Sequence, residues 1–370
     1  MALLVSGNKV PLYTQIAQTI KQRVRTGQYP AGQALPSVRT MCREFGVSVK
    51  AVHQAVRLLE DDGVVTTHPG KGVTVTGDNP CEKAALFFGV IHPYSKIEAY
   101  QQTVLGFVDE AFGERFNFSV VRSSKNDPAQ EKDLATHLVA NGAKGLLLWP
   151  ASDDPNGLFF QDLARKVPVV LVDRLLAGAD LPGVVMDHID GGRQIVAYLL
   201  GSLGKRRLLV LMDDLHISPY EELVQGIRQE AADRNRSADV TIVQLPISSS
   251  ILLDLCRSDF SRMDIHAGYV DRLMREGGYD AVFCTQGNFI NDVLVEAGVT
   301  DRYPGVQYAT MRGTDINTGS RRFNRLDLCQ WFYDYGRMVS EAAAMVQRWT
   351  ITRQAPRGVV RIKPVLTIKE

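Results

Sequence analysis

The residues from Leu35 to Val75 constrain the fold of this chain more than any other stretch. Ser37 precedes an apolar-periodic run, so its hydroxyl can cap a short helix from about Val38 to Phe45. Gly46 supplies the turn that follows, and Ser48 can cap a second helix. Two helices joined by so short a turn are the arrangement that lays its second helix in a DNA major groove.

The second helix has two faces. Apolar residues at three- and four-residue spacing predict a stripe buried against the first helix: Val49, Val52, Val56 and Leu59. The opposite, exposed face is polar: Lys50, His53, Gln54 and Arg57. Past Gly63 the sequence changes to residues that favour β-strands, on both sides of residues 68–72. Residues 68–72 contain the Pro and Gly typical of turns, together with a Lys. This pattern predicts a two-stranded wing.

Charge is divided unevenly along the chain. Residues 1–76 hold nine Lys and Arg against four acidic residues, a net charge of +5, whereas the whole chain carries +1. The remainder must therefore total −4. A basic head on an acidic body favours a head that meets phosphates and releases their counterions.

Residues 9–76 resemble the DNA-binding domain of GntR-family bacterial transcription regulators. The resemblance is carried by Leu35-Pro36-Ser37-Val38-Arg39, Gly46-Val47-Ser48, Val52-His53-Gln54-Ala55-Val56, and Gly63 followed by Pro69-Gly70-Lys71-Gly72. It implies double-stranded DNA as a partner, contacted by Ser37, Arg39, Ser48, Val49, Lys50, His53, Gly70 and Lys71. The family usually has Arg where this chain has Val49, so apolar contact such as that with a thymine methyl replaces guanine readout.

Length and composition describe an ordinary two- or three-domain chain. It has 370 residues, 45% of them hydrophobic and 22% charged. Five Cys without a CxxC pair or zinc spacing predict neither a disulfide framework nor a metal site. No apolar run reaches membrane-spanning length, so we expect a cytoplasmic protein.

The pattern predicts an amphipathic helix from Pro11 to Gln28, before the two helices described above, and a polar stretch follows the wing. We expect a DNA-binding domain at 1–76, a linker at 77–83 and a larger domain at 84–370. In this larger domain apolar strands alternate with helices. The expected strands are 84–91, 118–121, 145–149, 169–172, 207–212, 240–245 and 281–284. The expected helices are 95–112, 128–141, 158–166, 190–203, 219–234 and 287–298.

This alternation predicts an α/β fold with parallel sheets covered on both faces, in two successive lobes with a ligand between them. Residues 84–370 also resemble LacI-type effector domains, which are similar in fold to periplasmic sugar-binding proteins. The matching residues are Val172-Asp173-Arg174, Pro182, Val185, Asp187, Gly191, Gly192, Ala197, the run 199–207, the run 280–284, Gly313-Thr314-Asp315, Gln330 and Gly336. The combination of the two parts resembles the arabinose-repressor subgroup of GntR regulators.

Sugar recognition needs aromatic faces and planar groups that hold pairs of hydroxyls. Expected strand-end aromatics are Tyr94, Trp149, Phe289 and Trp331. The LacI resemblance assigns ligand contacts to Arg174, Gln286, Asp315 and Gln330, and more loosely to Trp149. Glu221 stands where the family usually has Arg, which favours a neutral polyol, although Glu221 can also be a solvated helix residue.

We predict a homodimeric, ligand-responsive transcription regulator without cofactor or enzymatic activity, and a repressor of carbohydrate-utilisation genes released by a neutral sugar. The alternatives are a nucleoside, sugar phosphate or acid as effector, or a pyridoxal-phosphate enzyme-like body in which Lys125 is the candidate lysine. Carboxylates and His266 between Ile247 and Gly278 raise the possibility of metal binding or catalysis. No ligand spacing repeats there, which favours a solvated insertion or helix face.

Overall fold

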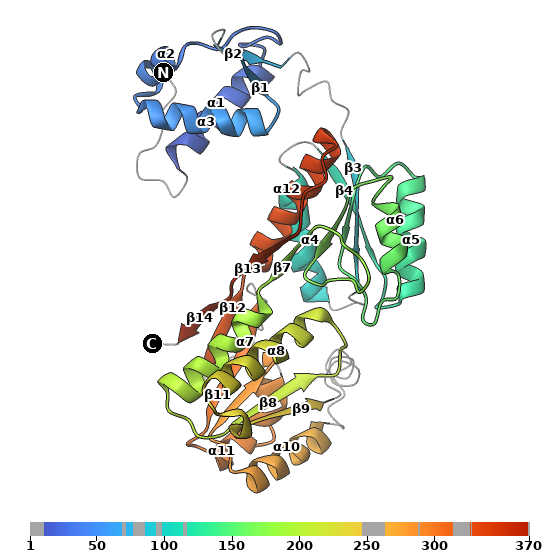
Figure 1. Cartoon of the computed structure of the whole chain (residues 1–370), viewed down its shortest axis with the longest axis vertical. Helices are drawn as coiled ribbons and strands as arrows, with labels where there is room; N and C mark the ends of the chain where they lie inside the picture. The colour runs from blue at the N-terminus through green and yellow to red at the C-terminus, as the bar shows by residue number, and fades with distance from the viewer. Residues whose placement is uncertain are drawn as a thin grey trace. The chain divides into compact units, whose positions relative to one another are not determined.

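The chain divides into two compact units, Met1–Ala85 and Leu86–Glu370, which we refer to as the head and the body (Figure 1). The computed structural model describes residues 11–68, 72–76, 86–93, 98–113, 117–245, 263–287, 289–313, 326 and 328–368. Each unit has a hydrophobic core of its own.

The head is a three-helix domain followed by two short strands. Its elements are α1 (Leu12–Arg25), α2 (Val38–Phe45), α3 (Val49–Asp61), β1 (Val65–His68) and β2 (Gly72–Val75). Ser37 and Ser48 cap α2 and α3, since their hydroxyls accept from the backbone N–H of Thr40 and Ala51. Gly46 ends α2 with a φ of +66°, and β1 pairs with β2 in antiparallel register. The predicted winged helix-turn-helix is therefore confirmed.

Two details of the head differ from the sequence prediction. The first helix is α1, which ends at Arg25 rather than at Gln28. Val49 is 55% exposed and lies outside the buried stripe, which continues through Val52, Val56 and Leu59. The stripe prediction is wrong at Val49 because the N-terminal end of α3, from Ser48 to Lys50, is exposed as a whole.

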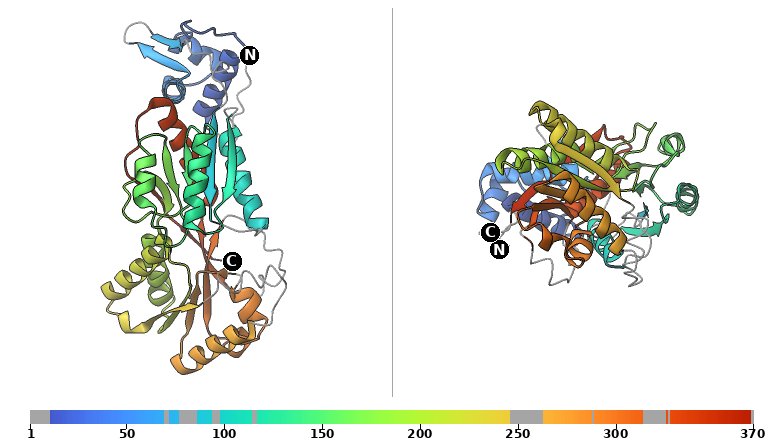
Figure 2. Two further views of the ribbon diagram at one scale, coloured as in Figure 1. Left: turned by 90° about the vertical axis from the view of Figure 1, so that its right-hand side faces the viewer. Right: turned by 90° about the horizontal axis from the view of Figure 1, so that it is seen from below.

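The first lobe of the body is built on a six-stranded sheet in the order β13-β7-β6-β5-β3-β4. Its strands are β3 (Phe87–His92), β4 (Phe118–Ser123), β5 (Leu146–Leu148), β6 (Val169–Val172), β7 (Gly183–Met186) and β13 (Val359–Ile362). All neighbours pair in parallel. Helices α4 (Glu98–Gly113) and α12 (Tyr335–Thr352) cover one face, and α5 (Pro128–Ala140) and α6 (Gly157–Leu163) cover the other (Figure 2).

The second lobe has a six-stranded sheet in the order β14-β12-β11-β10-β8-β9. Its strands are β8 (Leu208–Asp213), β9 (Val240–Leu245), β10 (Ala281–Cys284), β11 (Gln307–Gly313), β12 (Leu328–Tyr333) and β14 (Val365–Ile368). Only β14 pairs antiparallel, at the edge beside β12. One face is covered by α7 (His188–Val196), the π-helix η1 (Ala197–Ser202) and α8 (Ser218–Asp233). The other is covered by α10 (Met263–Gly277), the π-helix η4 (Phe289–Val295) and α11 (Val299–Arg302).

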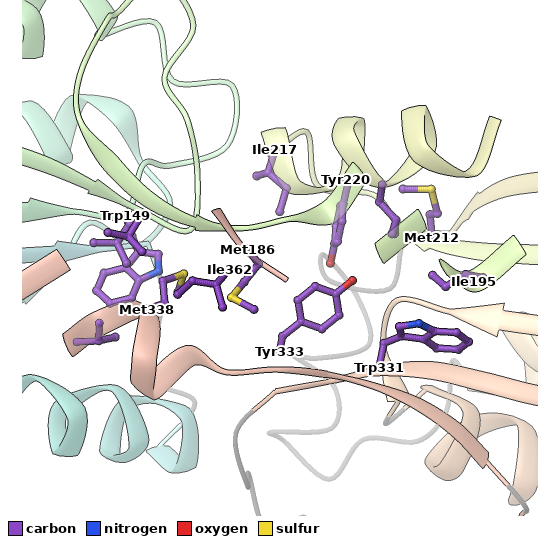
Figure 3. Packing of buried hydrophobic residues seen from close by; sticks show 14 of the residues in the cluster. Trp149, Met186, Ile195, Met212, Ile217, Tyr220, Trp331, Tyr333, Met338 and Ile362 are labelled. Atoms are coloured by element: carbon purple, nitrogen blue, oxygen red, sulfur yellow. The ribbon is translucent and has the colours of Figure 1, made fainter. Parts of the chain in front are cut away.

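Three segments cross between the lobes: β7 to α7, β12 to α12, and β13 to β14. The side chains at these crossings continue the core from one lobe into the other. Figure 3 shows the cluster running from Trp149 through Met186, Ile362 and Tyr333 to Trp331. The lobes are thus joined by a buried apolar connection as well as by the chain itself.

The α/β architecture agrees with the sequence prediction, but several elements were not predicted. Strands β7, β11, β12, β13 and β14 were missing from the expected list. Within the stretch taken as a solvated insertion or helix face, α10 buries Ala267, Val270 and Met274. The charged residues of this stretch obscured an apolar face at helical spacing.

Candidate functional site

The head presents a basic face on α2 and α3. Arg39, Lys50, His53 and Arg57 are all exposed. Two other cations of the head are held in ion pairs, Lys21 with Asp62 and Arg23 with Glu44. Within the described part of the head, Arg39, Lys50 and Arg57 form no ion pair, so their charge remains available to a polyanion.

The described residues therefore support a nucleic-acid interface at the N-terminal end of α3, where Ser48, Val49 and Lys50 lie together. The hydroxyls of Ser37 and Ser48 cap α2 and α3, and both serine residues are exposed. The predicted wing contacts Gly70 and Lys71 lie outside the described residues.

In the body, the loops that follow β5 and β6 of the first lobe meet the segment that follows β8 of the second. We call this region the lobe boundary. His216 Nδ1 lies 3.3 Å from Asp153 Oδ2, and the backbone N–H of Leu175 donates to Ser218 Oγ at 2.7 Å. The carboxyl ends of both sheets therefore face this boundary.

A third contact joins the lobes farther along α8. Arg361 of β13 donates through both terminal nitrogens to the two carboxylate oxygens of Glu222, at 2.8 and 2.7 Å. One segment of the second lobe, residues 216–222, thus carries three contacts to the first lobe. We call this segment the clasp.

Arg174 occupies the first-lobe side of the boundary, directly after β6. Its side chain is 4% exposed and its Nη1 donates to the carbonyl of Pro150 at 2.8 Å. Asp173 lies beside it, with 3.9 Å between Asp173 Oδ2 and Arg174 Nε. Burial raises the pKa of Asp173 to about 6, and the positive charge of Arg174 acts against that rise.

Backbone strain gathers at the same strand ends. Non-glycine residues with positive φ follow three strands of the first lobe: Lys125 and Asn126 after β4, Asp153 after β5, and Asp173 after β6. Their φ values run from 51° to 66°. Such conformations persist where the surrounding structure imposes them, and they concentrate at functional sites.

A buried carboxyl pair lies behind Arg174. Glu131 is fully buried, its Oε2 accepts from the backbone N–H of Ala151 at 2.9 Å, and its carboxyl group interacts with that of Asp154. Burial, followed by the contact with Asp154, raises the pKa of Glu131 to about 10, while Arg174 acts against the rise. Glu131 is therefore protonated at neutral pH.

The second-lobe side of the boundary holds a network of three polar side chains. Asp213, the last residue of β8, is fully buried. Its Oδ2 accepts from Gln286 Nε2 at 3.0 Å and from the Tyr220 hydroxyl at 3.5 Å. Burial raises the pKa of Tyr220, and the Asp213 carboxylate raises it further, whereas Gln286 and the more distant Arg174 act against the rise. Arg174 is thus close enough to influence groups of both lobes.

Of the residues predicted to bind the ligand, Arg174 lies on the first-lobe side of the boundary and Gln286 on the second-lobe side. Trp149 directly follows β5 but is 1% exposed and packs in the inter-lobe core. Glu221 is exposed on the first turn of α8, between the buried Tyr220 and the clasp residue Glu222. Tyr94 and Asp315 lie outside the described residues.

Other predicted residues lie elsewhere. Gln330 is half-buried inside β12, three residues before its end. Phe289 follows β10, as expected, and begins η4, whereas Trp331 lies inside β12 rather than after it. Neither side chain presents a free aromatic face. Each is buried in a core cluster. Lys125 is exposed in the turn after β4.

Sequence reasoning missed Asp213, Tyr220 and Glu131. Asp213 had a usable signal, because it is a carboxylate directly after the expected apolar strand 207–212. Glu131 had none, since it is one of several polar residues on a helix. The described residues hold no cluster of three or more His, Cys, Asp or Glu suited to a metal ion. Among them no helix is long and apolar enough to cross a membrane.

Known proteins match both the head and the body of this chain. Residues 12–75 match the family of bacterial regulatory proteins named gntR. The chain is 26% identical over 204 residues to the arabinose metabolism transcriptional repressor of Geobacillus stearothermophilus. That match covers 54% of this chain and 56% of the repressor, so the chain spans about half the length of this relative.

The body has solved structural neighbours. A LacI transcriptional regulator from Lactobacillus brevis matches with a TM-score of 0.61 and 18% identity, over 76% of this chain and all of the other. The myo-inositol binding protein of Caulobacter, bound to myo-inositol, matches with a TM-score of 0.63 and 16% identity, over 77% of this chain and 94% of the other. At these identities the likeness establishes the fold of the body.

Proposed function

We infer the function from two premises: the head matches the gntR family over residues 12–75, and the body has the two-lobed fold found in a LacI transcriptional regulator. From these premises we propose that the chain is a ligand-responsive repressor of sugar-utilisation genes, whose effector binds at the lobe boundary. The single observation that carries the effector site is the placement of Arg174 on the first-lobe side of the boundary, close enough to the Asp213, Tyr220 and Gln286 network of the second lobe for its charge to act on the pKa of Tyr220. The names of the relatives agree with this proposal, since one is an arabinose repressor and one binds a polyol.

DNA binding is the task of the basic face of the head. Lys50 and Arg57 of α3 and Arg39 of α2 supply cations for phosphates. Val49, exposed beside Lys50, gives apolar contact where a polar side chain would read a base edge. The sequence resemblance assigns further DNA contacts to Gly70 and Lys71.

The chemistry of the boundary suits a neutral polyol. Arg174 offers only hydrogen-bond donors, whereas the amide oxygen of Gln286 offers an acceptor. A sugar hydroxyl both donates and accepts, so a single ring can satisfy groups of both kinds. Glu221, exposed next to Tyr220, adds a second acceptor near the boundary. An acidic ligand would meet carboxylates on most sides.

Regulation follows from lobe closure. The clasp residues His216, Ser218 and Glu222 hold the lobes together by contacts that must break when they separate. A ligand that touches both lobes favours the closed arrangement by its differential affinity for the two states. In a homodimer joined through its bodies, closure changes the spacing of the heads and their fit to two half-sites.

The test is a pair of measurements on the full-length chain. Thermal melting is recorded with L-arabinose, D-xylose, D-ribose and myo-inositol, and with sugar phosphates and nucleosides. A compound at about a hundred times its dissociation constant adds roughly 2.7 kcal/mol, a shift of several degrees. Fluorescence anisotropy then follows the binding of duplexes selected from a random pool, with and without each hit.

We expect a neutral sugar to stabilise the body and to weaken DNA binding. Arg174→Ala should abolish both effects and leave DNA affinity without ligand unchanged. Arg165→Ala is the matched control, because Arg165 is exposed and pairs only with Asp162 among the described residues. A ligand response that survives in Arg174→Ala would show that this residue is not part of the site. If the wild-type chain binds no duplex, the proposed function as a transcription regulator is refuted.

A further inference from the structure

The hydrogen bonds of Asp213 decide how Gln286 is oriented. A carboxylate has acceptors only, so the group that faces it must be a donor. The Gln286 amide therefore turns its NH₂ towards Asp213 Oδ2, at 3.0 Å. The opposite orientation would set the amide oxygen against a buried negative charge.

Tyr220 uses the remaining hydrogen of that amide. Gln286 Nε2 lies 3.3 Å from the Tyr220 hydroxyl, and this hydroxyl donates its own hydrogen to Asp213 Oδ2 at 3.5 Å. Both hydrogens of the Gln286 amide are then engaged. The atom left to the ligand is Oε1 of Gln286, an acceptor without a donor among the described residues.

The network is fixed from behind. Asp213 Oδ1 accepts from the backbone N–H of Leu215 at 3.2 Å, and the backbone N–H of Asp213 donates to Thr285 Oγ1 at 3.1 Å. Asp213, at the end of β8, is therefore hydrogen-bonded to Thr285, which directly follows β10. Asp213 and Tyr220 are buried, so water does not compete for these bonds.

Resting on the proposed function, we propose that Asp213 is a positioning and specificity-determining residue: it presents Gln286 as an acceptor and its charge rejects anionic groups from the second-lobe side of the site. A hydroxyl satisfies Gln286 Oε1 by donating. A phosphate or carboxylate offers acceptors only, so it leaves Oε1 unsatisfied and approaches the negative charge of Asp213. Only the Arg174 side of the boundary suits an anion.

The experiment compares matched pairs of compounds on wild-type and Asp213→Asn full-length protein by calorimetric titration. The pairs are D-glucose with glucose 6-phosphate, myo-inositol with myo-inositol 1-phosphate, and L-arabinose with L-arabinonate. Asparagine keeps the shape, removes the charge and lets the Gln286 amide turn over. We expect the wild type to prefer a neutral member by about tenfold or more, and the variant to lose most of that preference.

Asp280→Asn is the matched control. Asp280 is also a second-lobe carboxylate, but it accepts from the backbone N–H of Arg206 and Arg207 at the amino ends of β8 and β10. Its loss should leave the preference intact. Should Asp213→Asn fail to fold, Gln286→Leu removes the acceptor and keeps Asp213, and it should lose the neutral ligand while still binding duplex DNA.

Four outcomes oppose the proposal. A wild type that binds the charged members at least as tightly contradicts the role of the Asp213 charge. An unchanged preference in Asp213→Asn, or unchanged neutral binding in Gln286→Leu, contradicts the positioning role while the proposed function stands. If none of the six compounds nor any sugar of the melting panel binds the wild type, the effector site itself is refuted, and the inference with it.

Discussion

Replacing Gly226 by alanine should loosen the second lobe. Gly226 lies in α8 where this helix meets α7, and an added Cβ would lie 2.1 Å from the carbonyl oxygen of Ile189 and 2.9 Å from its carbon. Both atoms are backbone, so no side chain can turn aside. Contacts below 3.0 Å are essentially absent from real Cβ atoms, so the two helices must separate by about 0.9 Å.

The magnitude follows from two opposing effects. Alanine in a helix interior is favoured over glycine by about 1 kcal/mol. Overpacking typically costs about 1–3 kcal/mol, and contact with backbone points to the upper end of that range or above it. We therefore expect Gly226→Ala to lower the free energy of unfolding by about 2 kcal/mol, which lowers the Tm of the body by roughly 4–8 °C.

Gly268→Ala supplies the control. Gly268 is exposed inside α10, and a Cβ there would meet no atom within 4 Å. The same substitution should raise stability by up to about 1 kcal/mol. Differential scanning calorimetry of both variants measures the effect. If the Tm of Gly226→Ala equals or exceeds that of the wild type, the close approach of α7 and α8 does not exclude a larger residue at position 226.

Three further predictions concern the head, the clasp and the buried carboxyl pair. Lys50→Ala should weaken binding to all duplexes and reduce the slope of log K against log salt by about one unit, measured by anisotropy; an unchanged slope would mean that Lys50 meets no phosphate. Glu222→Gln should weaken the bidentate contact with Arg361 and lower effector affinity about two- to fivefold in a calorimetric titration, since the clasp favours closure; equal affinity would show that this pair does not distinguish the two states. In the folded protein Glu131 has a pKa of about 10 and is protonated at neutral pH, whereas in the unfolded chain it is ionised. Because the native state holds this extra proton, the free energy of unfolding should fall between pH 7 and 9 by up to about 1.4 kcal/mol per pH unit. Glu131→Gln should remove that slope in denaturant titrations, and a variant with the wild-type slope would contradict a neutral Glu131.

Much of the local structure could be predicted from sequence because it depends on neighbours along the chain. The Ser37 and Ser48 caps and the Gly46 turn act within three or four residues. The buried strands were visible because a strand covered on both faces must be apolar throughout, as in β6.

Tertiary structure decided the rest, because it depends on residues far apart in the chain. Asp213 and Gln286 are 73 positions apart and meet only because β8 pairs with β10. Arg361 reaches Glu222 across 139 positions because β13 returns to the first lobe beside β7. The sequence by itself determined the winged helix-turn-helix, the alternation of strands and helices and the charge of the head. The pairing of strands determined which polar groups face one another at the lobe boundary, since no spacing along the chain encodes a contact that the sheet order creates.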